Sequence, residues 1–242
     1  MNTAKMMERI AQTSPRIKAR MAGLSQLLEA LTATFGQVIV PGKLFVLGSA
    51  ATTATNILAH QQLFWLGFGS SLIGVIFHIV WAFLLYDLLK PVDRRLSLFA
   101  MFVILVACAV QALNSLLYVA PLSILTSGNT AGAFTTEQLQ ALALLFVKLN
   151  TYAFDIYLVF FGFWLILIGY LIFRSAFMPR VLGVLLAISG LGWMLFLIPP
   201  FATHLFPVIA AASALGEIPL EFWLIIKSVN AQRWREQASL SV

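Results

Sequence analysis

Four ionisable side chains stand inside otherwise apolar stretches of the sequence: Glu29, His78, Glu217 and Glu221. An ionisable group in hydrocarbon costs about 2.5–3.5 kcal/mol on insertion scales, so such residues are rare and often functional. A carboxyl group in a low dielectric can hold a proton, and an imidazole exchanges protons near neutral pH. The four residues are therefore candidates for a proton relay or for a site that binds a small ligand or an ion. Alternatively, they hydrogen-bond across helices and only fasten them together.

Three of these residues come at similar heights on their helices. Measured from the basic residue at the inner end of each helix, Glu29, His78 and Glu217 lie roughly 14, 18 and 15 Å deep at the rise of an α-helix. Glu221 lies one turn below Glu217 on the same face. The spacing predicts a polar cluster near the middle of the membrane if the helices that carry these residues are neighbours.

The helices of Glu29 and Glu217 have further features of a buried polar centre. Thr32 and Gly36 share one helix face with Glu29, and such a face belongs against protein or water. Pro219 lacks an N–H group and predicts a kink in the helix of Glu217. Helices broken at this depth expose backbone groups to substrate in many transporters, although prolines also occur there for packing alone.

A second set of polar residues lies toward the opposite side of the membrane. Lys148, Asn150 and Asp155 fall in the first half of one long helix, and we interpret them as outer-face candidates. Histidines in loops at unknown distances are weak evidence for metal binding, so we expect no metal site. His78 is the only histidine in an apolar segment, so the sequence predicts no haem or other cofactor.

The composition explains why these residues must be positioned by membrane helices. Hydrophobic residues make up 61% of the 242 residues and charged residues 10%, against about 25% charged in ordinary soluble domains. The mean hydropathy is +0.94. Nine acidic and fifteen basic residues are too few to cover that apolar surface in water, which excludes a soluble domain. The bases stand at the ends of apolar runs, so we expect no nucleic-acid binding.

The predicted fold is an all-α integral membrane protein, a bundle of six transmembrane helices. A helix that crosses the hydrocarbon needs about 20 apolar residues. Ser14-Pro15 is a helix start, Pro121 and Pro199 are predicted helix ends, and residues 135–138 are a capping box. We expect a cytoplasmic segment 1–19, one membrane domain over 20–228 and a tail over 229–242. The predicted helices are 20–40, 63–86, 96–120, 139–173, 181–198 and 205–226.

The distribution of bases predicts the orientation. Thirteen of the fifteen Lys and Arg residues fall at the N-terminus, at the turns around 90–95 and 174–180, and in the C-terminal tail. Cytoplasmic loops carry the excess of Lys and Arg in membrane proteins. Both termini are therefore expected on the cytoplasmic side of the cell membrane. The outer side should carry a short interfacial helix near residues 49–62.

Four stretches resemble a family of prokaryotic membrane proteins, the domain of unknown function 4386. They are Ala54–Leu58, Glu137–Leu142, Phe173–Ser175 with Pro179–Val184, and Gly216-Glu217 with Phe222–Leu224. The resemblance covers about residues 17 to 235 and implies a six-helix membrane protein, with no activity attached. In that family a histidine often stands at the position of Asn150, with an acid near Lys148, so no outer-face role is carried over to this pair.

Two classes of function fit these observations, and a third is weaker. A small transporter or membrane-embedded binding protein would use the polar centre, with a small molecule or an ion as its ligand. A structural or accessory membrane protein would use the same residues only to join helices. A membrane enzyme comes third, because neither HExxH nor GxSxG is present, and no catalytic residue is predicted. Besides the lipid bilayer, no partner or oligomeric state is indicated.

Overall fold

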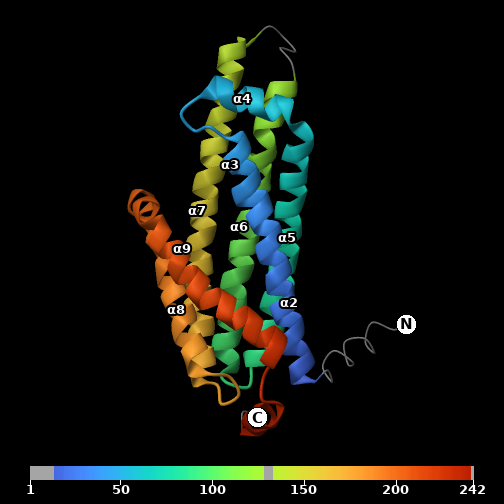
Figure 1. The fold of residues 1–242 in the computed structure, drawn as a ribbon, viewed down its shortest axis with the longest axis vertical. Helices are drawn as coiled ribbons and strands as arrows, with labels where there is room; N and C mark the ends of the chain where they lie inside the picture. The colour runs from blue at the N-terminus through green and yellow to red at the C-terminus, as the bar shows by residue number, and fades with distance from the viewer. Residues whose placement is uncertain (1–13, 128–132, 241–242) are drawn as a thin grey trace, which may run out of the picture. The chain divides into compact units, whose positions relative to one another are not determined.

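The computed structural model describes residues 14–127 and 133–240, and every regular element within these ranges is helical. The order of the elements can be followed by colour in Figure 1. The elements are α2 (Pro15–Ala33), η1 (Thr34–Ile39), α3 (Val40–Leu44), α4 (Ala50–Ala59), α5 (Gln61–Leu89), α6 (Arg94–Thr126), α7 (Thr136–Arg174), α8 (Arg180–Met194), η2 (Leu195–Leu197), α9 (Pro199–Phe222), η3 (Trp223–Lys227) and α10 (Ala231–Leu240).

Five helical segments in the described residues are long and apolar enough to cross a membrane. They contain α5, α6, α7, α8 with η2, and α9 with η3. They correspond to the last five of the six predicted spans. The first differs because α2 carries Arg16, Lys18, Arg20 and Glu29, and because the π-helical turn η1 follows it. Residues 15–44 are nevertheless helical without a break.

Local sequence signals set several helix ends. The carbonyl of Ser14 accepts the first helical bonds of α2, and Pro15 begins the helix, as predicted. The capping box at the start of α7 is confirmed, because the Gln138 N–H donates to Thr135 Oγ1 and the Thr135 N–H donates to Gln138 Oε1. Ser49 caps α4, which matches the expected short helix.

Other ends differ from the prediction. The helix α6 continues past Pro121 to Thr126, because a proline removes only one helical hydrogen bond and neighbouring helices support the backbone. The helix α9 begins directly at Pro199, six residues before the predicted start at 205, because Pro at the first helical position needs no N–H partner. The predicted N-terminal segment lies partly outside the described residues, in 1–13.

The chain folds into two compact units. Among the described residues, 28–78, 106–127 and 133–158 form one, called here the Glu29 unit. Residues 14–27, 79–105 and 159–240 form the other, called the Glu217 unit. The helices α2, α5, α6 and α7 contribute residues to both units.

The Glu29 unit is built on close contacts between small residues and on an apolar core. A Cβ atom at Gly36 would come within 2.5 Å of the Gly67 carbonyl oxygen, so η1 and α5 pack backbone to backbone. The Ser70 hydroxyl on α5 donates to the Thr32 carbonyl oxygen at 2.9 Å. Small residues and hydroxyls of this kind are how helices approach closely in a membrane. The core contains Val40, Leu44, Ile57, Phe64, Tyr118 and Leu122.

The Glu217 unit uses the same packing between α7, α8 and α9. Gly162 on α7 lies against the Gly190 carbonyl, and Gly216 on α9 lies against the Leu185 carbonyl, so a Cβ atom at either glycine would overlap the neighbouring helix. The short helix α10 is held by its Trp234 indole N–H, which donates to the Leu88 carbonyl oxygen at 2.8 Å. The helix α10 is therefore fastened to the C-terminal end of α5.

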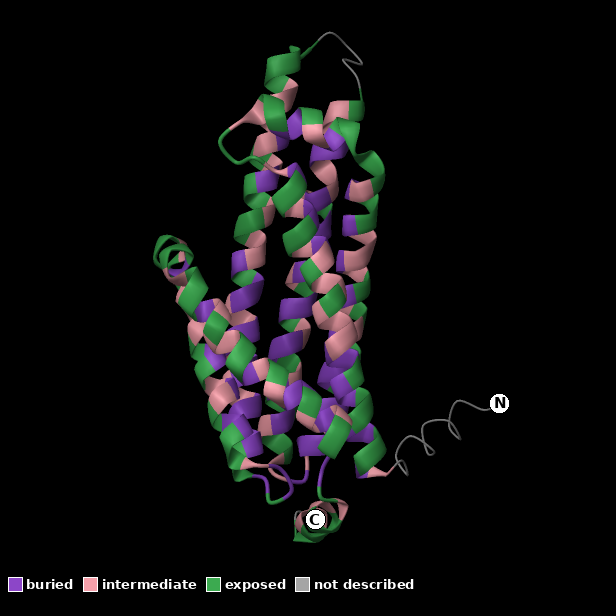
Figure 2. Ribbon diagram, in the orientation of Figure 1, coloured by how far each residue is buried: buried purple, intermediate pink, exposed green. Residues whose placement is uncertain are grey.

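Large apolar side chains remain exposed on the long helices. Leu116 on α6 is 70% exposed, Val208 on α9 66% and Ile76 on α5 60%. Figure 2 shows that each long helix carries both buried and exposed residues along its length. A soluble protein rarely leaves so many large apolar side chains in water, whereas lipid covers them without cost.

Candidate functional site

Glu29 and His78 meet in the Glu29 unit. Nδ1 of His78, on α5, lies 3.4 Å from Oε1 of Glu29, on α2. The His78 side chain is 2% exposed and the Glu29 side chain 15%. The sequence predicted that these two residues lie at similar depth, and the structure brings them together. Two ionisable groups thus share one buried position inside apolar helices.

A third residue, Tyr157 on α7, completes this cluster. Its hydroxyl lies 3.2 Å from the same nitrogen, Nδ1 of His78. A ring nitrogen that carries a proton donates, and one without a proton accepts. Nδ1 of His78 can thus donate to or accept from the Tyr157 hydroxyl, and the same nitrogen lies beside the Glu29 carboxylate.

Glu217 has a separate set of partners in the Glu217 unit. Its Oε1 accepts hydrogen bonds from Ser189 Oγ at 2.8 Å, Trp193 Nε1 at 3.1 Å and Ser213 Oγ at 2.6 Å. Ser189 and Trp193 lie on α8, and Ser213 lies one turn before Glu217 on α9. A buried polar group must be paired in this way to avoid its desolvation cost. The network joins α8 to α9.

Two other predicted residues lie on α9 near Glu217. Glu221 is buried, and a Cβ atom at Gly23 on α2 would come 3.0 Å from the Glu221 carbonyl oxygen. The helix runs through Pro219 to Phe222, and the change to π-helical bonding comes only at Trp223. The kink at Pro219 stays a prediction.

The outer-face candidates have different surroundings, although all three lie on α7. Lys148 is exposed. Nδ2 of Asn150 donates to Oδ1 of Asn114 on α6 at 2.9 Å, a bond between two helices. Asp155 is 8% exposed and makes no hydrogen bond or ion pair with the described residues. Within residues 14–127 and 133–240, no group of three metal-ligating side chains gathers.

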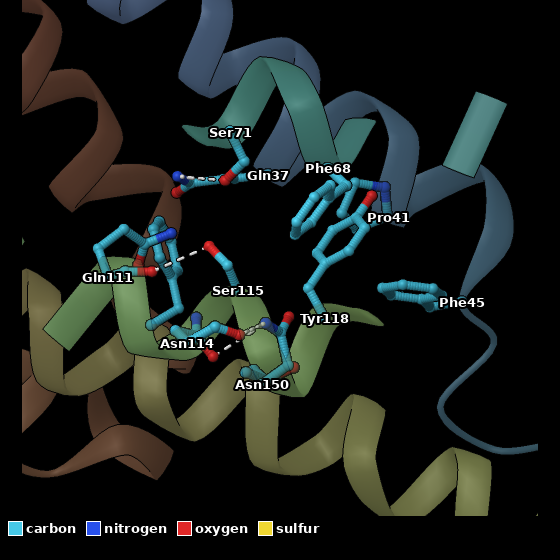
Figure 3. Close-up of a pocket in the computed structure, with 12 residues that line it drawn as sticks. Gln37, Pro41, Phe45, Phe68, Ser71, Gln111, Asn114, Ser115, Tyr118 and Asn150 are labelled. Atoms are coloured by element: carbon cyan, nitrogen blue, oxygen red, sulfur yellow. Dashed lines mark hydrogen bonds between the residues drawn. The ribbon is translucent and has the colours of Figure 1, made fainter. Parts of the chain in front are cut away.

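The Glu29 unit also contains a cavity that sequence reasoning did not anticipate (Figure 3). Its volume is about 110 Å³. The lining comes from η1, α3 with its C-cap, α5, α6 and α7, and it combines apolar side chains with polar ones that carry no charge. It consists of the amides Gln37, Gln111, Asn114 and Asn150, the hydroxyl residues Ser71, Ser115, Tyr118 and Thr151, and the apolar residues Pro41, Phe45, Phe68 and Phe154.

Two buried oxygens of the lining have no partner. Gln111 is 4% exposed and Tyr118 is 4% exposed. Neither Oε1 of Gln111 nor the Tyr118 hydroxyl has a hydrogen-bond partner among the described residues. An unsatisfied buried polar atom costs about 1–3 kcal/mol.

The cavity and the Glu29–His78 cluster are in contact. Phe154 lines the cavity. Its ring stacks on the ring of Tyr157, with centroids 5.6 Å apart and planes at 20°. The Tyr157 hydroxyl in turn reaches His78. Only the Phe154 ring would therefore stand between a molecule in the cavity and Tyr157, which bonds the His78 imidazole.

A buried charge cluster in the Glu217 unit was also missed. Lys18 on α2 and Lys90 both form ion pairs with Asp87 on α5. Lys18 is only 4% exposed. In the sequence, Lys18 is one of several bases near the N-terminus, and Lys90 is one of several in a turn. Their spacing gives no sign that Lys18 is buried.

These features describe an all-helical protein suited to a membrane, with polar groups in its interior. The chain belongs to the family described as Domain of unknown function (DUF4386), whose model matches residues 21–228. This confirms the resemblance seen in its four stretches. An "Uncharacterized protein" of Archaeoglobus fulgidus is 33% identical over 73 residues, which are 30% of this chain and 44% of that protein. The match thus spans less than half of that relative. No solved structure matches this chain.

Proposed function

We propose that this protein is a small transporter or membrane-embedded binding protein whose proton-binding centre is formed by Glu29 and His78. The observation that carries the proposal is the buried contact at 3.4 Å between Nδ1 of His78 and Oε1 of Glu29. Two apolar side chains of similar volume would pack at this place without electrostatic cost. An ionisable pair inside a membrane helix bundle is by default a functional site.

The proposed proton exchange uses one nitrogen and two partners. With protons on both ring nitrogens, the His78 imidazolium faces the Glu29 carboxylate through Nδ1. When the Nδ1 proton passes to the carboxylate, Glu29 becomes neutral, and His78 becomes the neutral tautomer that keeps its proton on Nε2 and has a lone pair on Nδ1. The Tyr157 hydroxyl, 3.2 Å away, then donates to Nδ1. The transfer thus exchanges the hydrogen-bond partner of the imidazole, which is a way to link proton binding to a rearrangement of α2, α5 and α7.

The proposed topology has six spans in the cell membrane with both termini in the cytoplasm. The first span is the unbroken helix over residues 15–44, roughly 45 Å long. The positions of the basic residues support this orientation. Cys108 is the only cysteine and is buried, so Cys108→Ser provides a background for labelling. An impermeant maleimide should label Ala51→Cys in intact cells and Ser239→Cys only after lysis. The reverse pattern would contradict the orientation.

A structural role without transport is the second candidate, and the Glu217 network favours it for that part of the protein. Three donors already satisfy Oε1 of Glu217 and join α8 to α9. We propose that Glu217 and Glu221 stabilise the fold and that the exchange of protons belongs to Glu29 and His78. An enzymatic function is the weakest of the three.

Proton flux into liposomes tests the proposal. The purified full chain is reconstituted with a pH-sensitive dye inside, and a potassium diffusion potential drives protons inward. We expect flux above that of empty liposomes for the wild type and a loss of this flux in Glu29→Gln. The matched control is Glu137→Gln, because Glu137 is exposed in the first turn of α7. Equal flux in wild type and Glu29→Gln would disprove the proton centre, and wild-type flux no higher than that of empty liposomes would favour the structural role.

A further inference from the structure

We infer that the cavity lined by Gln111 and Tyr118 is a binding site for a small uncharged molecule that both donates and accepts hydrogen bonds, of the class of the primary amides. The inference deepens the proposed function by naming a ligand class. It rests on that function only for the effect of the ligand on the proton centre. Binding itself follows from the cavity alone.

The absence of charge in the lining selects a neutral ligand. None of the residues that line the cavity is Asp, Glu, Lys, Arg or His. A carboxylate or an ammonium group that enters the cavity would lose its hydration and find no opposite charge. The cost of burying an isolated charge is far larger than that of burying an amide.

The unpaired oxygens select the hydrogen-bonding groups of the ligand. Oε1 of Gln111 is an acceptor only, so it needs a ligand that donates. The Tyr118 hydroxyl can donate, so it suits a ligand that also accepts. By contrast, Asn150 already bonds Asn114 and Gln37 already bonds Ser71. A primary amide offers the N–H and the carbonyl oxygen that the two unpaired atoms require.

The size and the aromatic walls narrow the class further. The cavity has about 110 Å³. An engineered cavity of about 150 Å³ holds benzene, so the ligand here has about six heavy atoms or fewer. Phe45, Phe68 and Phe154 supply aromatic rings to the wall, and Figure 3 labels the first two. A flat amide can lie against such rings, whereas a polyol would press hydroxyl groups onto them without partners.

The same wall connects the ligand to the proton centre. Phe154 stacks on Tyr157, whose hydroxyl bonds Nδ1 of His78. A ligand that shifts the Phe154 ring also shifts Tyr157. This would change the balance between the two partners of the imidazole, so ligand and proton binding should influence each other.

Thermal unfolding of the full chain in detergent tests the inference, with acetamide as the ligand. We expect a saturable rise in Tm with acetamide, a smaller one with N,N-dimethylacetamide, which lacks the N–H, and none with acetate. Gln111→Leu and Tyr118→Phe should each weaken the acetamide affinity about five- to tenfold, the usual effect of one hydrogen bond. Neither should lower the Tm without acetamide, because each removes an unpaired oxygen. Ser189→Ala, in the Glu217 unit, is the control and should keep the acetamide response.

The outcomes separate the site from the proposed function. No saturable rise in the wild type, or an unchanged acetamide affinity in both Gln111→Leu and Tyr118→Phe, would overturn the site. Glu29→Gln should still bind acetamide, since Glu29 does not line the cavity. Acetamide binding without any proton flux would therefore refute the proton centre and leave the site standing. Proton flux without acetamide binding would refute the binding site and leave the proton centre standing.

Discussion

The Tyr157 hydroxyl and the His78 imidazole lie 3.2 Å apart, on helices α7 and α5. The contact is buried, since His78 is 2% exposed and Tyr157 8%. Through it, α7, which also lines the cavity, reaches the nitrogen that faces Glu29. The phenol therefore holds one of the two hydrogen-bonding arrangements proposed for the imidazole.

Removing that phenol should impair proton exchange without abolishing it. In Tyr157→Phe the aromatic ring remains, but Nδ1 of His78 loses one of its two partners. We expect proton flux to fall about tenfold, the value of one hydrogen bond of about 1.4 kcal/mol, while Glu29→Gln loses it altogether. Liposome flux assays measure both. Wild-type flux in Tyr157→Phe would show that the hydroxyl takes no part.

The Glu217 network should affect stability and leave flux unchanged. Ser189→Ala removes the donor on α8 that lies 2.8 Å from Oε1 of Glu217 on α9. Hydrogen bonds between membrane helices contribute about 0.6–1.7 kcal/mol, so we expect a loss of that size in the free energy of unfolding. Reversible unfolding in mixed micelles measures it. A fall in proton flux at unchanged stability would instead show that Glu217 takes part in proton exchange.

Close packing of η1 on α5 should make Gly36 intolerant of any side chain. A methyl group there would lie 2.5 Å from the Gly67 carbonyl oxygen and 2.7 Å from the Ser71 nitrogen, both backbone atoms. We expect Gly36→Ala to cost about 1–3 kcal/mol of unfolding free energy, as overpacking does. The control is Gly69→Ala on α5, where a Cβ atom meets nothing within 4 Å. If Gly36→Ala is as stable as Gly69→Ala, the helices do not approach this closely.

The ion pair between Lys18 and Asp87 should matter more than that between Lys90 and Asp87. Asp87→Asn leaves Lys18, 4% exposed, with a buried charge and no counter-ion. Removing one partner of a buried pair costs about 3–5 kcal/mol. Lys90→Met should cost under about 1 kcal/mol, because the side chain of Lys90 is 42% exposed and exposed pairs contribute little. Chemical unfolding of the two variants compares them directly, and equal losses would contradict the difference in burial.

The sequence predicts the local features of this fold well. Apolar runs locate α5 to α9, and the capping box at Thr135 marks the start of α7 because these signals depend on residues close in the chain. Depth along the helix also places Glu29 and His78 at comparable heights, and the two side chains meet.

Helix neighbours are the part that the sequence does not predict. Glu217 has a depth similar to that of Glu29, yet it hydrogen-bonds within its own unit. Tyr157 joins the cluster and Gln111 lines the cavity because of the way the helix faces pack together. This packing depends on contacts between residues far apart in the sequence. Gln111 and the pair Ser70-Ser71 are polar residues in apolar runs, and they are the local signal that could have indicated the cavity.

The most direct test of the proposed function is whether a ligand in the cavity moves protons through Glu29 and His78. Liposomes with the reconstituted protein and a pH-sensitive dye inside receive an inward gradient of acetamide, and the initial change of internal pH is recorded. We expect a pH change in the wild type that exceeds that of empty liposomes, is lost in Glu29→Gln and, at acetamide concentrations below saturation, is about five- to tenfold smaller in Gln111→Leu. A wild-type response equal to that of empty liposomes, or a full response in Glu29→Gln, would contradict it.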